Sequence, residues 1–152
     1  MRTPQEHENF ELLCELETRI SRQVERDGFE SLPTPARIIY AVWWLDADVS
    51  NGGFDQYFFN SWGDYSADAL RGLQTIGAAS TADTLRRATA VFPSPGPSPD
   101  RTIRGDQLEA FSPAQEDVLE ALDNEFFERP DDLEGLLADF ARRNADILTS
   151  IT

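Results

Sequence analysis

Residues 51–65 read NGGFDQYFFNSWGDY, and this stretch lies between segments with helical periodicity. Gly52 and Gly53 permit a tight corner, because glycine adopts backbone conformations that other residues avoid. Beyond the corner, aromatic residues recur at the spacing of one helix face, namely Phe54, Tyr57, Phe58 and Trp62. Gln56 and Asn60 are four residues apart, so their amides lie together and can hold the backbone at the corner. The stretch predicts a joint between two helices.

Two longer helices are predicted upstream of this joint. The first runs from about residue 5 to residue 27 and ends at Gly28. Its apolar face carries Leu13, Leu16, Ile20 and Val24. The second begins at Thr34, which is followed by proline at the first helical position, and continues towards Val49. Ser50 and the glycine corner then break it.

Three short helices are predicted next along the chain. An aromatic helix spans residues 54–62, and another runs from Ser66 to Gly77. A third is expected to begin with a capping box formed by Ser80 and Asp83 and to end near Phe92.

The last third of the chain begins with a proline-rich connector at residues 93–99, which we expect to be extended and stiff. Ser112, Pro113 and Gln115 then give a strong helix start, and the buried stripe of that helix comprises Val118, Leu119, Leu122 and Phe126. A final helix opens at Asp131 and faces inward with Leu133, Leu136, Leu137, Phe140, Ile147 and Leu148. The sequence therefore predicts an all-α fold, a single domain over residues 1–152 with about six or seven helices.

The amino-acid composition excludes several classes of function. The 152 residues include 28 acids and 13 bases, all of them arginines, for a formal net charge of −15. This charge argues against direct binding to nucleic acid or to an anionic membrane, which attract positive side chains. No apolar run reaches the ~20 residues of a membrane span, and the N-terminus does not resemble a signal peptide. Cys14 is the single cysteine, so no internal disulfide forms, and we expect a cytoplasmic protein.

Residues for common catalytic and metal chemistry are scarce. The single histidine, His7, and Cys14 supply at most half of a metal site. Residues 46–50 open like a calcium loop, but Asn51 stands where the turn glycine belongs and Tyr57 where the bidentate glutamate belongs. A phosphate-binding glycine loop would need a lysine, which the chain lacks. We therefore predict no metal, no cofactor and no enzymatic activity.

Acidic residues concentrate near the C-terminus. Asp106–Asp139 holds twelve acids and a single arginine, Arg129, for a net charge of −11. On the helix that begins after Ser112, the side opposite the apolar stripe carries Glu116, Asp117, Glu120, Asp123 and Glu128. Phe127 lies within this acidic face and is expected either to pack under the last helix or to be an exposed anchor.

One acidic row is sparser than a DNA strand. A carboxylate on each helical turn gives about 5.4 Å between charges, whereas phosphates follow one another at about 3.4 Å along a strand. A second row on the final helix would approach the density of DNA, and the residues for it are Asp131, Asp132, Glu134 and Asp139. Acidity also promotes solubility, so charge alone does not establish mimicry.

The core Asn-Gly-Gly-Phe-x-Gln-Tyr-Phe-x-Asn, from Asn51 to Asn60, resembles the signature of the bacterial DNA-mimic protein family. The likeness continues through residues 64–70, 76–78 and 84–88 and into the final helix. It implies an α-helical acidic protein that occupies the DNA-binding surface of a transcription regulator, with a homodimer among the arrangements it implies. We expect the signature residues themselves to be structural: Asn51, Gly52, Gly53, Phe54, Gln56, Tyr57 and Asn60.

The leading hypothesis is a non-enzymatic protein whose acidic helices bind a basic protein, such as a DNA-binding regulator. The predicted contact residues are Glu116, Asp117, Glu120, Asp123, Glu128, Asp131 and Asp132, with Asp46, Asp48, Asp55 and Asp64 as a secondary set. Two alternatives stay open. An immunity or antitoxin-like protein that neutralises a basic toxin needs the same acidic face. An enzyme would instead use Asn51, Gln56, Tyr57, Asn60 and Asp64, and a water-filled pocket at these residues would favour it.

Overall fold

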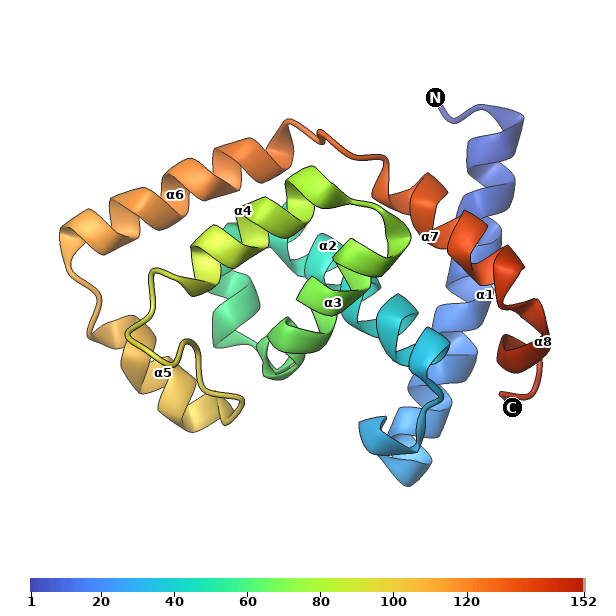
Figure 1. Ribbon diagram of the computed structural model, residues 1–152, viewed down its shortest axis with the longest axis horizontal. Helices are drawn as coiled ribbons and strands as arrows, with labels where there is room; N and C mark the ends of the chain where they lie inside the picture. Colours follow the sequence, from blue (N-terminus) through green and yellow to red (C-terminus); the bar gives the residue numbers. More distant parts are fainter. Residues whose placement is uncertain (152) are drawn as a thin grey trace.

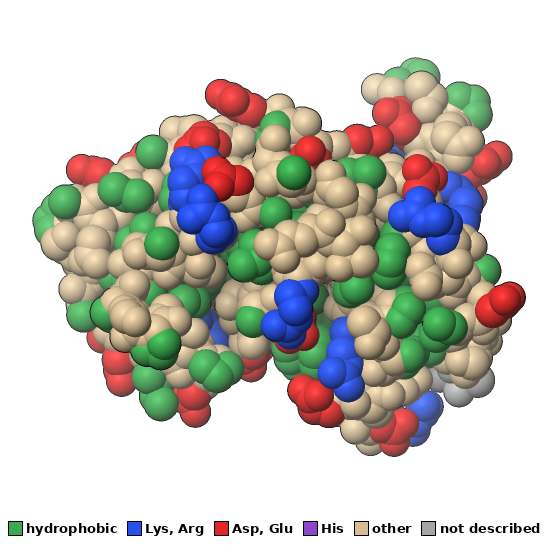
Figure 2. Space-filling model, viewed as in Figure 1, with side chains coloured by type: hydrophobic (Ala, Val, Ile, Leu, Met, Phe, Trp, Pro, Cys, Tyr) green, Lys and Arg blue, Asp and Glu red, His purple; other side chains and the backbone are tan. Residues whose placement is uncertain are grey.

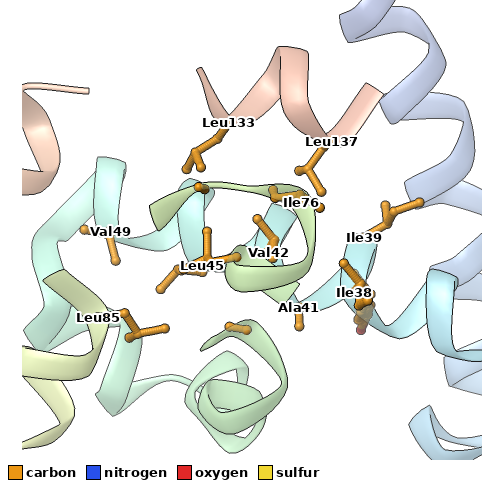
Figure 3. Close-up of a cluster of buried hydrophobic side chains, with 14 of the residues drawn as sticks. Ile38, Ile39, Ala41, Val42, Leu45, Val49, Ile76, Leu85, Leu133 and Leu137 are labelled. Carbon is orange, nitrogen blue, oxygen red and sulfur yellow. The ribbon is translucent and has the colours of Figure 1, made fainter. Parts of the chain in front are cut away.

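Helix α2 (Thr34–Phe59) runs through the middle of the computed structural model, which describes residues 1–151 (Figure 1). Pro35 lies in its first turn, but the cap residue is Pro33 rather than the predicted Thr34, and no side chain caps this helix start. Its apolar side chains point to several sides, which is the pattern of a helix surrounded by protein. Figure 3 shows Ile38, Ile39, Val42, Leu45 and Val49 of α2 meeting residues from the neighbouring helices, among them Ile76, Leu85, Leu133 and Leu137.

Helix α1 (Pro4–Asp27) packs against α2 and against α7, at the right of Figure 1. A capping box between Thr3 and Glu6 starts it, and Gly28, with φ of 86°, ends it. A 3₁₀ turn, η1 (Phe29–Ser31), leads into α2. The first two predicted helices are therefore confirmed, although the second one continues well beyond Val49.

The corner at the glycine pair is a kink within α2. Gly52 and Gly53 have non-helical backbone angles, and the φ of Gly53 is 78°. The helix resumes after them and continues to Phe59, where a 3₁₀ turn, η2 (Ser61–Tyr65), follows. The predicted aromatic helix over residues 54–62 is thus the second half of α2 followed by part of η2.

Helices α3 (Ser66–Ile76) and α4 (Ala79–Thr89) form a hairpin across α2 (Figure 1). Gly77 ends α3 in the left-handed conformation, as predicted. The capping box predicted for α4 is wrong. The cap residue of α4 is Ala78, whose side chain cannot form a hydrogen bond with the start of the helix. The carboxylate of Asp131 takes this role. Its Oδ2 accepts hydrogen bonds from Thr81 N at 2.7 Å and from Thr81 Oγ1 at 2.8 Å.

Helix α5 (Arg101–Glu109) was not predicted. Asp100 caps it by accepting a hydrogen bond from Ile103 N at 3.0 Å. The proline-rich connector before it forms turns and bends rather than an extended strut. The side chain of Gln107 bonds the backbone of Gly96 and Ser98, and this draws the connector back onto α5.

Helix α6 (Pro113–Phe127) begins with the predicted Ser112–Gln115 capping box and lies beside α4. Its buried stripe comprises Leu119, Leu122 and Phe126. Val118, which was predicted to be buried, lies at the edge of that stripe and is 51% exposed.

The predicted last helix is divided into α7 (Leu133–Arg143) and α8 (Ala145–Leu148). Asn144 separates them, and its side chain bonds back to Phe140 O at 2.8 Å. The break turns Ile147 outward, contrary to the prediction. Within residues 1–151 there are eight α-helices and no strand, so the all-α prediction is confirmed. None of these helices combines the length and apolar character needed to span a membrane.

Candidate partner-binding surface

The polar residues of the corner form hydrogen bonds with one another. Asp48 accepts hydrogen bonds from Gln56 Nε2 at 3.1 Å and from Asn60 Nδ2 at 3.0 Å. Asn51 Nδ2 donates to Gln56 Oε1 at 3.1 Å. The two halves of α2 are thereby tied across the glycine kink. Asp48 is only 7% exposed, so its prediction as a partner-contact residue is wrong.

The corner is packed with aromatic rings. Phe54, Tyr57 and Phe58 are fully buried, and Phe54 meets Phe126 of α6 edge to face at 5.8 Å between ring centroids. Burial strongly raises the pKa of Tyr57, so its phenol stays protonated. The close packing of these buried rings disfavours the enzyme alternative, in which the polar residues of the corner would surround a water-filled pocket.

A buried arginine holds η2 and the connector against the corner. Arg104 of α5 is 0% exposed. Its guanidinium donates to the carbonyl oxygens of Phe58, Asn60 and Ser98 and to Asp64 Oδ1, the last at 2.9 Å. Asp64, predicted as a secondary contact residue, therefore has one oxygen committed to an internal ion pair. Sequence reasoning missed the role of Arg104 because three of its four partners lie at least forty residues away in the chain and three of the four are backbone atoms.

Asp123 joins α6 to the corner. Its Oδ1 accepts a hydrogen bond from Phe54 N at 2.8 Å, which caps the second half of α2. A Cβ atom at Gly53 would lie 2.4 Å from Asp123 Oδ2, so the glycine makes room for this carboxylate. Burial raises the pKa of Asp123 above its ordinary value, and the charges of Asp55 and Glu120 add to this although the Phe54 bond opposes it.

We use the name acidic wall for eight carboxylates on α5, on α6 with its C-cap residue and on the adjacent part of α2, four of which, Asp55, Glu116, Glu120 and Asp123, line one hollow. Its members are Asp55, Asp106, Glu109, Glu116, Asp117, Glu120, Asp123 and Glu128. Seven are exposed, and Asp123 is half-buried. Within residues 1–151, no arginine forms an ion pair with any of them. Five of the predicted contact residues thus belong to one uncompensated surface, and Asp55 joins them from the secondary set.

The second acidic row predicted on the final helix does not form. Asp131 caps α4, and Asp132 caps α7 through Gly135 N at 3.1 Å. Glu134 pairs with Arg2, and Asp139 lies 3.5 Å from Arg142. Arg129 folds back onto Asp46, predicted as a secondary contact residue, at 2.7 Å. The four acids expected to form the second row are therefore used in caps and ion pairs, whereas Asp106 and Glu109 of α5 have no arginine partner within residues 1–151.

The arginines of α4 and α5 bind groups outside the acidic wall, although Arg87 lines the same hollow as Glu128. Arg87 of α4 binds Glu125 through two hydrogen bonds of 2.9 and 2.6 Å, on the flank of α6 that faces α4. Arg101 lies over the Phe59 ring, and Arg104 is buried. Figure 2 shows arginine side chains over α3 and α4 beside acidic ones, whereas acidic side chains project from the edges formed by α5 and α6.

Of the two positions expected for Phe127, packed under the last helix or exposed, the structure shows the exposed one. Phe127 is 47% exposed on α6, on the same side of the helix as Glu116 and Asp123. The exposed-anchor interpretation of this residue is the one that fits its position.

Fold and surface together define a class, that of all-helical proteins with one uncompensated anionic face. Residues 30–144 match the family described as DMP19-like protein, and the chain belongs to this family of DNA mimics. The matched range includes α2 to α7, and so covers both the corner and the acidic wall. No curated protein and no solved structure matches the chain.

Proposed function

We propose that this protein is a non-enzymatic DNA mimic, whose acidic wall occupies the DNA-binding surface of a basic protein such as a transcription regulator. The observation that carries the proposal is the set of eight carboxylates without an arginine partner on α5, α6 and Asp55. Membership of the DMP19-like family supports it.

The physical case rests on the arrangement of the charges. Several acids elsewhere on the molecule are matched by arginines three or four residues away, as Asp68 is by Arg71 and Asp83 by Arg86. Such pairing removes most of the long-range field of a surface. The carboxylates of the acidic wall have no such arginine partners. Most of them lie on α5 and α6, which are consecutive helices. An unpaired anionic surface attracts the cationic surfaces that evolved to hold phosphates, and it accelerates their association.

The corner supports this proposal in a different way. Asp48, Asn51, Gln56 and Asn60 bond to one another, so these residues contribute to folding, and Asp123 of α6 bonds the backbone of Phe54 next to Asp55. Function is thereby assigned to the wall rather than to the signature.

The test is affinity capture from a lysate at low and high salt, followed by competition between this protein and DNA for the captured partner. A triple variant of the wall, Glu116→Gln, Asp117→Asn and Glu120→Gln, should lose most of the capture. A matched control, Glu8→Gln, Glu25→Gln and Asp146→Asn, removes the same three charges from exposed residues that form no ion pair in residues 1–151. It should retain the capture.

Three results would count against the proposal. Binding that is indifferent to salt would exclude an electrostatic interface. Equal losses in the wall variant and the control would show that only net charge matters. Capture of a nuclease toxin instead of a DNA-binding regulator would favour the immunity alternative.

A further inference from the structure

A groove opens within the acidic wall, where α5 and α6 meet the corner of α2. It has a volume of about 310 Å³. Its lining comprises Asp55, Leu108, Phe111, Glu116, Leu119, Glu120 and Asp123. The three apolar residues are buried or partly buried and form the floor, while the four acidic ones surround it. The groove thus combines an apolar floor with an anionic rim.

The negative charge in the groove is uncompensated. Asp123 uses one oxygen to bond Phe54 N, and the other three carboxylates are exposed. Charges of one sign in a hollow with low-dielectric walls focus their field on an entering ion of the opposite sign. The raised pKa of Asp123 is the response of a carboxyl group to this burial and to the neighbouring charges of Asp55 and Glu120.

We propose that this groove receives a single arginine side chain of the basic protein partner, an inference that rests on the proposed function. The apolar floor suits the methylene stem of arginine, which lies along apolar surfaces while its charged end reaches polar groups. The planar guanidinium carries five donors and can bind two or more carboxylates at once. Lysine fits the groove less well, because its ammonium group is a more strongly hydrated point charge. A bare metal ion would gain nothing from contact with Leu108, Phe111 and Leu119.

The experiment is an NMR titration of the full chain with N-acetyl-arginine amide at low ionic strength. Backbone amide shifts should concentrate at the groove residues. Guanidinium chloride, which lacks the stem, should bind about fivefold more weakly or worse, because it buries none of the methylene surface. N-acetyl-lysine amide should also bind more weakly than the arginine amide.

A matched pair of variants separates the groove from net charge. Glu120→Gln should weaken the binding of the arginine amide by about twofold to fivefold, the effect of one partly exposed ion pair. Glu8→Gln removes the same charge from an exposed residue of α1 and should leave the affinity unchanged. The inference is overturned if the two variants weaken binding equally. It is also overturned if the shifts spread over all exposed acids, or if guanidinium or the lysine amide binds as tightly as the arginine amide.

The inference and the proposed function fail in different ways. If the protein displaces DNA from its partner but the titration shows no preference for the groove, the wall acts as a diffuse anionic surface, and only the arginine assignment is lost. If the groove binds the arginine amide but the protein never competes with DNA, the proposed function is lost.

Discussion

Arg104 offers the most direct test of how this fold is held together. The variant Arg104→Met keeps the length and most of the volume of the side chain but removes all of its hydrogen-bond donors. Four acceptors then lose their partner, namely Asp64 Oδ1 and the carbonyl oxygens of Phe58, Asn60 and Ser98. The substitution therefore tests a buried polar cluster rather than packing.

The expected loss is large. Removing one partner of a buried ion pair typically costs about 3–5 kcal/mol, because the remaining charge and acceptors stay desolvated. Asp64 is partly exposed, with 32% of its side chain accessible, so water reaches it and the lower part of that range applies. About 3 kcal/mol is a substantial share of the roughly 5–15 kcal/mol by which domains are stable. It corresponds to a change of roughly a hundredfold in the ratio of folded to unfolded protein.

Urea denaturation followed by circular dichroism measures this loss. With a slope near 2 kcal/mol per molar, the midpoint should fall by about 1.5 M while the slope stays unchanged. Arg101→Met is the matched control on the same helix. Arg101 is exposed, so its bond to Phe59 O and its position over the ring should contribute less than about 1 kcal/mol. A loss below about 1 kcal/mol for Arg104→Met, or equal losses for the two variants, would refute the reasoning.

Three further outcomes are expected. The folded-state pKa of Asp123 is raised, so the folded state holds this proton more tightly than the unfolded chain, and stability falls as the pH rises through and above the ordinary range of aspartate. In Asp123→Asn the amide oxygen can still accept a hydrogen bond from Phe54 N, so this variant should remove that loss and slightly raise the denaturation midpoint at neutral pH. Asp123→Ala loses the cap and should lower the free energy of unfolding by about 0.5–2 kcal/mol. Equal effects of the two variants across a pH series of denaturation curves would contradict this. Gly53→Ala should destabilise the fold by more than about 1 kcal/mol in a thermal melt, because its φ is 78° and its Cβ would press on Asp123; an unchanged melt would contradict it. Asp131→Ala should cost about 0.5–2 kcal/mol and speed amide exchange at Thr81, and slow exchange there would exclude the cross-chain cap.

Much of the fold could be predicted because its signals are local. The capping box at Ser112 and the end of α3 at Gly77 depend on residues within a few positions of each other, and both are confirmed. The cap of α4 was missed because its carboxylate, Asp131, lies fifty residues away in the chain. Helix α5 was missed because it is short and lacks an apolar stripe, and it is held by Arg104, whose partners cannot be seen in sequence.

The candidate surface was also predicted only in part, because some of its determinants are local and others depend on contacts between distant residues. Periodicity alone places Glu116, Asp117 and Glu120 on the outer side of α6, where the structure has them. The predicted final helix also carries acids, but Asp131 caps α4 and Glu134 pairs with Arg2, and both contacts join distant parts of the chain. Counting charges along the chain therefore overestimates the acidic surface at α7 and overlooks α5.

The double role of Asp123 divides the acidic wall into two kinds of position. Asp117 and Glu128 are exposed, and their carboxylates form no hydrogen bond or ion pair within residues 1–151, so substitutions there should change the charge pattern without disturbing the fold. Asp123 caps the second half of α2 and also lines the groove, so it cannot be exchanged freely. Relatives that acquire new partners are therefore expected to diverge at the periphery of this surface while its centre stays constant.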